Sequence, residues 1–110
     1  MLNKHIFKAN AGEGKTRWLV EKALQAQDEG VIHIAYAGSL KGYNNFSEVY
    51  EAQAHHRCNI PHISIDDGMQ PGIKSAILTD DLVNEVNYLP RISEFAEGDW
   101  YITMPAEMFI

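Results

Sequence analysis

A chain of 110 residues has the usual size of one domain and is too short to hold two independent hydrophobic cores. Apolar residues make up 45% and charged residues 22% of the sequence, which excludes a disordered chain and predicts a globular domain. The 15 acidic and 9 basic residues give a net charge of −6, so we expect no general affinity for nucleic acids or anionic membranes.

The sequence also argues against secretion. Cys58 is the only cysteine, so no internal disulfide can form. No N-terminal stretch joins a basic start to a long apolar run, and no apolar run approaches the roughly 18 residues of a membrane span. We therefore expect a cytoplasmic protein without a membrane segment, and Met1 favours a whole gene product.

The first third of the chain alternates short apolar runs with a helix-like segment, the pattern of parallel strands joined by crossover helices. Residues 5–8 predict a first strand that leads into a glycine-rich turn. Residues 16–27 carry apolar side chains at helical spacing, and Gly30 supplies the end of that helix. Residues 31–37, VIHIAYA, are β-branched and bounded by glycines, which predicts a buried strand.

The middle of the chain predicts one more helix and strand. Asn45, followed three residues later by Glu48, resembles a capping box. We therefore expect a helix that begins after Asn45 and ends near Arg57. Residues 62–65, HISI, alternate in hydropathy and predict a strand that ends at a pair of aspartates.

The last third adds two strands around a helix. Residues 76–79, AILT, predict a strand that also ends at two aspartates. Pro90 suits the first turn of a helix over residues 92–97, with Gly98 as its cap, and residues 100–104, WYITM, predict the final strand. All 110 residues then form a single α/β domain, a three-layer sandwich with a small, mostly parallel sheet of about five strands.

The stretch ANAGEGKT, residues 9–16, has the spacing of the phosphate-binding P-loop, with Ala9 where a glycine is usual. Glycines let such a loop turn its backbone N–H groups inward, and the following helix adds its N-terminal donors and its dipole. Lys15 would reach the β- and γ-phosphates, and the Thr16 hydroxyl would bind Mg²⁺. The alternative is an ordinary glycine turn with a solvated lysine. The expected nucleotide-binding residues are Asn10, Ala11, Gly12, Glu13, Gly14, Lys15, Thr16 and Arg17.

Hydrolysis or phosphoryl transfer also needs a carboxylate at the end of a neighbouring strand, to hold the water shell of Mg²⁺. Asp80 and Asp81 directly follow one predicted strand, and Asp66 and Asp67 follow another. We prefer Asp80 as the magnesium ligand, with Asp66 as the alternative. Both pairs could also be simple turn formers, because aspartate is favoured in turns.

These elements together resemble a small P-loop NTPase of the additional-strand branch, which includes RecA-like ATPases, helicases and thymidine kinases. In that branch a catalytic glutamate follows the magnesium aspartate, and a polar sensor residue commonly ends the next strand. The resemblance favours Asp80, because one further predicted strand, ending at Thr103, follows it. It implies that Asp81 positions the attacking water, with Glu85 as a reserve base.

The resemblance implies binding and Mg²⁺-dependent hydrolysis of a nucleoside triphosphate, ATP ahead of GTP, coupled to a partner or to self-assembly. The alternatives are a degenerate or non-hydrolysing P-loop module that docks on another protein, and a small-molecule or nucleoside kinase. In the leading hypothesis Thr16 and Asp80 hold the metal. The catalytic residues are Lys15, Asp80, Asp81 and Glu85.

Three weaker hypotheses concern other residues. Self-association is expected because residues 108–110, MFI, follow the last predicted strand, and Arg57 or Arg91 could then reach a neighbour's γ-phosphate. Trp18 could stack on a base, although packing of its helix on the sheet is the alternative. Four nearby residues are of the types that bind zinc, although their spacing matches no recognised zinc motif: His55, His56, Cys58 and His62.

Overall fold

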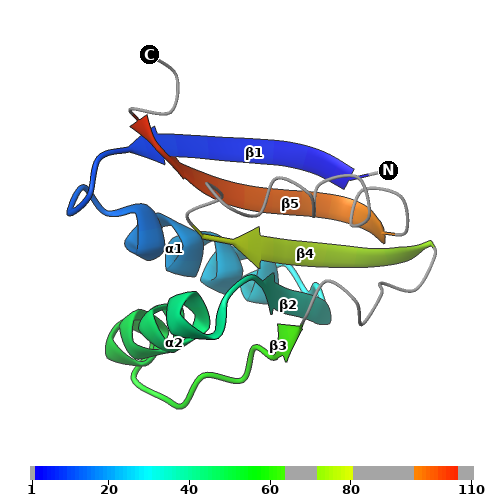
Figure 1. Ribbon diagram of the computed structural model, residues 1–110. Helices are drawn as coiled ribbons and strands as arrows, with labels where there is room; N and C mark the ends of the chain where they lie inside the picture. The colour runs from blue at the N-terminus through cyan, green and yellow to red at the C-terminus, as the bar shows by residue number, and fades with distance from the viewer. Residues whose placement is uncertain (1, 64–71, 81–95, 107–110) are drawn as a thin grey trace.

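The computed structural model of the chain describes residues 2–63, 72–80 and 96–106 (Figure 1). Its five strands form one all-parallel sheet in the order β1-β5-β4-β2-β3. The predicted α/β class with a small parallel sheet is therefore confirmed. The elements are β1 (Leu2–Ala9), α1 (Lys15–Asp28), β2 (His33–Ala37), α2 (Leu40–Ala54), β3 (His62–Ile63), β4 (Ile73–Thr79) and β5 (Ala96–Pro105).

The strand β5 lies between β1 and β4, and the carboxyl ends of all three strands meet at one edge of the sheet. Phe7 of β1 pairs with Thr103 of β5, while Ile102 pairs with Thr79 at the end of β4. The three arrowheads point the same way in Figure 1, toward the loop between β1 and α1. Open parallel sheets bind ligands at this edge.

Both described helices pack on one face of the sheet and against each other (Figure 1). The buried stripe of α1 contains Leu19, Val20 and Ala23, whose spacing of one, three and four residues puts them on one side of a helix. Phe46 and Tyr50 are the buried residues of α2 and also lie on one side of their helix. These side chains form the main core together with Ile34, Tyr36, Ala76 and Leu78 of β2 and β4.

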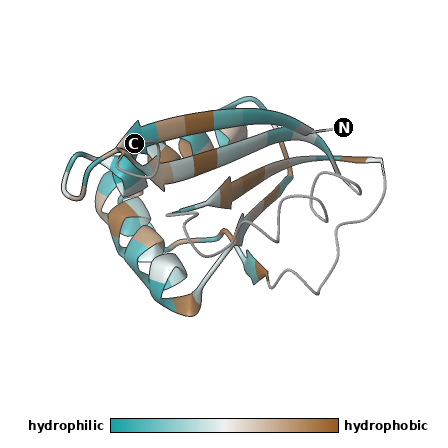
Figure 2. Cartoon of the chain, turned by 45° about the horizontal axis from the view of Figure 1, so that its top comes forward, coloured by the Kyte–Doolittle hydropathy of each residue, from teal (hydrophilic) through white to brown (hydrophobic). Residues whose placement is uncertain are grey.

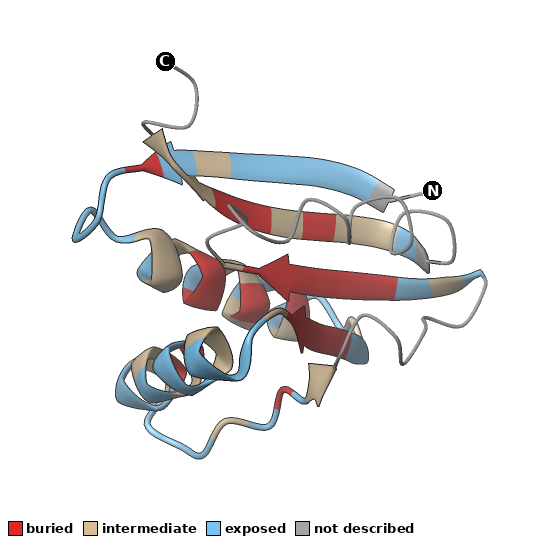
Figure 3. Cartoon of the chain, viewed as in Figure 1, coloured by how far each residue is buried: buried red, intermediate tan, exposed pale blue. Residues whose placement is uncertain are grey.

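The other face of the central strands is buried as well. Ile77 of β4 and Trp100 and Ile102 of β5 are fully buried, although they point away from the face that the two helices cover. The middle of the sheet is buried and hydrophobic over much of its length (Figures 2 and 3). Burial on both faces explains why these strands are nearly continuous apolar runs, and it is compatible with a small three-layer sandwich.

The predicted start of the second helix is wrong. The helix α2 begins at Leu40, and its N-cap is Ser39, whose Oγ accepts a hydrogen bond from the Gly42 backbone N–H at 3.0 Å. Gly42 makes this segment look like a loop, but it is needed for close packing. A Cβ atom there would lie 2.4 Å from the Tyr36 hydroxyl, so a larger residue would require the Tyr36 side chain or α2 to move.

The predicted end of the third helix is also wrong. Ala96 and Glu97, expected in a helix over residues 92–97, belong to β5, while residues 92–95 lie outside the described part of the chain. Gly98, expected as a helix cap, lies inside that strand at φ 109°. A Cβ atom there would lie 2.2 Å from the Ser75 carbonyl oxygen, so this glycine permits the close approach of β4 and β5.

Other bounds differ from the predictions by a few residues. The first strand is longer than residues 5–8, and β2 begins at His33 because the Val31 N–H still bonds to the Ala26 carbonyl at the end of α1. The strand β3 covers His62 and Ile63, and residues 64 and 65 fall outside the described residues. Neither helix in the described ranges combines the length and hydrophobicity needed to cross a membrane.

Candidate functional site

The loop of residues 10–14 reverses the chain between β1 and α1. Gly12 and Gly14 have φ values of 83° and 88°, in the left-handed region that glycine enters without strain. The Glu13 N–H donates to the Asn10 carbonyl at 3.1 Å, and the Asn10 N–H donates to Glu13 Oε1 at 2.6 Å. The loop is exposed, and it is a compact turn held by reciprocal hydrogen bonds.

The amino end of α1 opens directly from this loop. Its N-cap is Gly14, which has no side chain to accept from the first N–H groups, and its first turn carries no acidic residue. The first N–H groups of a helix have no partner within it, and the helix dipole is positive at this end. Lys15 and Thr16, both half-buried, are the first two helical residues. The local charge and donors favour an anion at this point.

Asp80 lies directly after β4 and faces the start of α1. Its Oδ2 accepts a hydrogen bond from Thr16 Oγ1 at 2.7 Å, and its Oδ1 accepts from Thr103 Oγ1 at the end of β5. Thr16 and Asp80 are 64 residues apart in the sequence. The structure therefore brings together the two residues that the sequence assigns to the metal, and it adds Thr103 to them.

A buried hydrogen bond fixes the end of β4 just before this acid. Trp100 Nε1 donates to Thr79 Oγ1 at 2.9 Å, and both residues are fully buried. Thr79 is the last residue of β4, and Asp80 follows it directly. The Trp100 bond thus ties β5 to β4 beneath the site and sets the position from which Asp80 leaves the strand.

A residue from α2 also reaches this site. Asn45 Nδ2 donates a hydrogen bond to Thr16 Oγ1 at 3.1 Å. The sequence pattern does not reveal this role, because the spacing of Asn45 and Glu48 predicts a helix cap instead. Nothing in the spacing of polar residues could have revealed it, since the contact depends on how α2 packs against α1. The site therefore gathers side chains from α1, α2, β4 and β5.

A shallow hollow of about 600 Å³ lies beside the glycine loop, and its wall includes Arg17 and Trp18. Arg17 is exposed there. The Trp18 ring stacks on Phe7 with a centroid distance of 5.2 Å and meets Tyr101 edge-on at 6.0 Å. These contacts pack α1 on β1 and β5, which is the alternative to base stacking that the sequence left open.

Only some of the remaining predicted residues fall within the described ranges. Arg57 does, and it lies exposed after α2. The predicted residues outside the described ranges are Asp66, Asp67, Asp81, Glu85, Arg91 and residues 108–110.

Three of the four residues suggested for zinc contact backbone carbonyl groups. The Cys58 thiol donates to the Ile60 carbonyl at 3.9 Å, and a His62 ring nitrogen lies 2.7 Å from the Gly38 carbonyl. His56 lies 2.9 Å from the Arg57 carbonyl. In residues 2–63, 72–80 and 96–106, no group of three or more His, Cys, Asp or Glu side chains is arranged to hold a metal.

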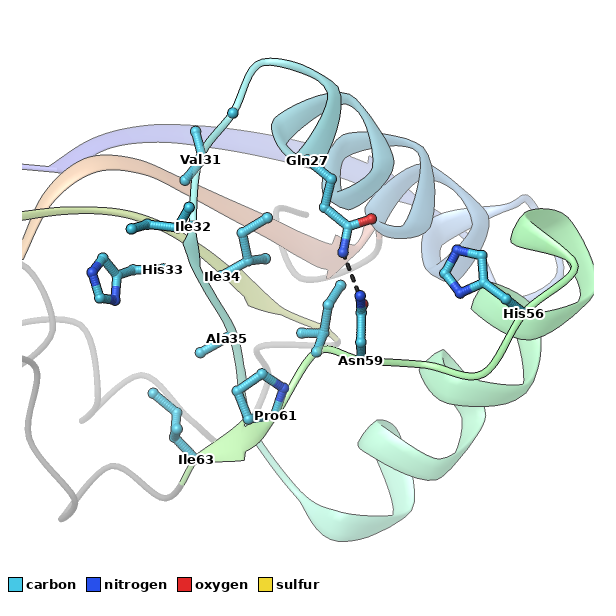
Figure 4. A pocket seen from close by; sticks show the side chains of 12 residues that line it. Gln27, Val31, Ile32, His33, Ile34, Ala35, His56, Asn59, Pro61 and Ile63 are labelled. Carbon is cyan, nitrogen blue, oxygen red and sulfur yellow. Dashed lines mark hydrogen bonds between the residues drawn. The ribbon is translucent and has the colours of Figure 1, made fainter.

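A second hollow, of about 620 Å³, lies far from the glycine loop, at the amino end of β2 (Figure 4). Val31, Ile32 and Ile34 line it, and Gln27 and Asn59 form part of its wall through a hydrogen bond of 2.9 Å. Among the described residues around it there is no Asp, Glu, Lys or Arg. Its described lining therefore offers no carboxylate, ammonium or guanidinium group to a phosphate or a hard cation.

No family model matches the chain, and neither a curated protein nor a solved structure matches it significantly. The function is therefore inferred from the geometry around Thr16 and Asp80.

Proposed function

We propose that the chain binds a nucleoside triphosphate with Mg²⁺, ATP ahead of GTP, and hydrolyses it. The observation that carries the proposal is the hydrogen bond of 2.7 Å between Thr16, at the start of the helix after the glycine loop, and Asp80, at the end of a neighbouring strand. A hydroxyl and a carboxylate in contact beside a helix N-terminus are the protein ligands that a magnesium-bound triphosphate needs.

The loop geometry supports phosphate binding. Left-handed glycines at positions 12 and 14 turn the backbone around a point in front of the uncapped amino end of α1. Lys15 begins that helix and would add its ammonium group to the β- and γ-phosphate oxygens. Since the chain carries a net charge of −6, this local arrangement has to supply the attraction for a polyanion.

The strand order supports the additional-strand branch. The strand β5 lies between β1, which leads into the glycine loop, and β4, which ends at Asp80. Thr103 lies near the carboxyl end of this additional strand, and its hydroxyl donates to Asp80. This is the position at which the family resemblance leads us to expect a polar sensor residue.

The residues at the site fit Mg²⁺ better than an ion that requires a complete protein cage. Thr16 and Asp80 would offer one hydroxyl and one carboxylate, and Mg²⁺ ordinarily takes its remaining ligands from water and phosphate oxygens. Bound there, the ion would neutralise charge on the β- and γ-phosphates. Lys15 would hold the transferring phosphate, and Asp81 or Glu85 would orient the attacking water.

We also propose that turnover is coupled to self-assembly or to a protein partner. Within the described sheet β1 pairs with β5 alone, so the other edge of this eight-residue strand has no neighbour among the described residues. Ile6 on this strand is 48% exposed. An exposed edge strand is a common site of association between chains.

Replacement of Lys15 tests the proposed function. A charge pair near 4 Å is worth about 4 kcal/mol at an effective dielectric of about 20, so Lys15→Ala should weaken Mg²⁺–ATP binding about a thousandfold in titration calorimetry. Lys22→Ala is the matched control, because Lys22 lies on the same helix, 5.7 Å from the centre of the Trp18 ring. It should bind nucleotide as the wild type does.

Phosphate release measured alongside binding separates the alternatives. If the wild type releases phosphate from ATP and Asp80→Asn does not, the result supports hydrolysis. Binding without release would instead support a switch or docking module, and consumption only after an acceptor is added would support a kinase. A wild-type protein that binds neither ATP nor GTP at millimolar concentration with Mg²⁺ present would overturn the proposal.

A further inference from the structure

The Thr16 hydroxyl has two hydrogen-bond partners, and they come from different elements. Its oxygen lies 2.7 Å from Asp80 Oδ2 and 3.1 Å from Asn45 Nδ2. A hydroxyl has one hydrogen to donate and two lone pairs that can accept. An ionised carboxylate can only accept, so the hydrogen goes to Asp80 and the amide of Asn45 must be the donor.

These two bonds leave one direction of the Thr16 oxygen uncommitted. The hydrogen points to Asp80 and one lone pair accepts from Asn45, so a single lone pair is left for a cation. Threonine in a helix ordinarily divides between two rotamers, because its hydroxyl can also bond to a carbonyl of the preceding turn. The Asn45 amide favours the rotamer in which the hydroxyl faces Asp80.

The backbone that carries Asn45 is held firmly. The next residue, Phe46, and Tyr50 one turn further are fully buried in the core between α2, α1 and the sheet. Ser39 caps the start of the same helix, and Gly42 lets it approach Tyr36 closely. The Asn45 amide is therefore presented to Thr16 from a packed helix, which makes it suited to fix a side-chain orientation.

We propose that Asn45 is a positioning residue of the magnesium site: its amide orients the Thr16 hydroxyl so that the remaining lone pair faces the ion. The inference rests on the proposed function, because the ion it concerns is that of the bound Mg²⁺–nucleotide. It also makes the packing of α2 on α1 part of the site, since a shift of α2 would release Thr16. Groups that orient metal ligands in this way typically affect metal affinity about 10- to 100-fold.

The test compares Asn45→Ala with Asn44→Ala. Both changes remove an asparagine amide from α2 and alter helix propensity equally, but the bond to Thr16 belongs to Asn45. Titration of ATP with Mg²⁺ should show about a 10-fold loss of affinity for Asn45→Ala, and the same titration in EDTA should show less than about a 2-fold change. Asn44→Ala should match the wild type in both buffers.

Equal losses with and without Mg²⁺ would indicate a merely structural role and would overturn the inference. An unchanged affinity of Asn45→Ala for Mg²⁺–ATP would also overturn the inference, but it would leave the proposed function intact. A wild type that binds no nucleotide would overturn both proposals, whereas loss of binding in Lys15→Ala together with wild-type behaviour of Asn45→Ala would overturn only this one.

A measurement without nucleotide checks the contact itself. Asn45→Ala should lower the urea midpoint relative to Asn44→Ala when Thr16 is present, because it removes a hydrogen bond to the hydroxyl. In the Thr16→Val background, where no hydroxyl is left, the two asparagine variants should have the same midpoint. A difference of equal size in both backgrounds would overturn the inference.

Discussion

Gly98 is the residue whose replacement should disturb the sheet most. Its φ of 109° is unfavourable for any residue with a Cβ atom, and such an atom would lie 2.2 Å from the backbone oxygen of Ser75. Neither β4 nor β5 can shift easily, because both are buried at the centre of the sheet. We expect Gly98→Ala to lower the free energy of unfolding by about 3 kcal/mol or more, measured by urea denaturation.

Gly30→Ala is the matched control for that prediction. Gly30 also has a positive φ, 85°, but nothing lies within 4 Å of the position its Cβ atom would occupy. The substitution should therefore lower stability only by the conformational penalty of about 1 kcal/mol. Equal losses for the two variants would show that the contact with Ser75 does not matter.

The residues of the candidate site differ in how far their sequence context predicts them. Lys15 and Thr16 follow from the spacing of the glycine loop, because the chemistry of phosphate binding requires those residue types there. Asp80 follows from its place after an apolar run, and the structure brings it to Thr16. Asn45 could not be predicted, because a local pattern describes its neighbours along the chain and not the helix packed beside it.

At the scale of the element, the N-cap of α2 is testable by substitution. Ser39 Oγ accepts from the Gly42 N–H at 3.0 Å, and loss of such a cap ordinarily costs about 1 kcal/mol. Ser39→Ala should lower the urea midpoint accordingly. Ser47→Ala, inside the same helix, should leave it unchanged or raise it slightly, because alanine is the better helix former. An unchanged urea midpoint in Ser39→Ala would contradict the assignment of Ser39 as the N-cap.

The elements that sequence reasoning placed wrongly share one cause. Gly98 predicts the end of a helix, whereas in the structure it lets β4 and β5 approach closely, and Gly42 lets α2 approach the Tyr36 side chain. A sequence does not distinguish these uses, because both need only the absence of a side chain. The helix α1 and the apolar strands were predicted well, since burial of one helix face or both sheet faces leaves a direct periodic signal.

At the scale of the whole molecule, alternation of strands and helices predicts a parallel sheet but not the order of its strands. In particular, β5 pairs with β1, from the opposite end of the sequence, as well as with β4. The strand order determines where the site lies, because it brings the carboxyl ends of these three strands together at one edge of the sheet. The loop motif alone is therefore enough to propose phosphate binding, whereas the geometry that joins Thr16, Asp80 and Thr103 required the folded chain.

The stability of the whole molecule should decline at alkaline pH through Tyr101. Burial raises the pKa of its phenol above 10.0, and the charges of Asp99 and Glu29 raise it further. The unfolded chain loses this proton near its ordinary pKa of about 10, whereas the folded chain retains it to higher pH. The contribution to stability is therefore complete below about pH 10 and is lost as the pH rises through the folded-state pKa.

Tyr101→Phe isolates this contribution, because it removes the phenol and keeps the ring that stacks on His5 at 4.8 Å. Urea midpoints measured from about pH 8 to about pH 11 should fall less steeply above pH 10 in the variant than in the wild type. Asp99→Asn should lower the pKa of Tyr101 and move the onset of its titration in the folded protein to lower pH. Parallel curves of urea midpoint against pH for the wild type and Tyr101→Phe would contradict this prediction. The loss of stability at alkaline pH would then come from groups that titrate in both proteins. Tyr43 is one such group, because burial raises its pKa as well.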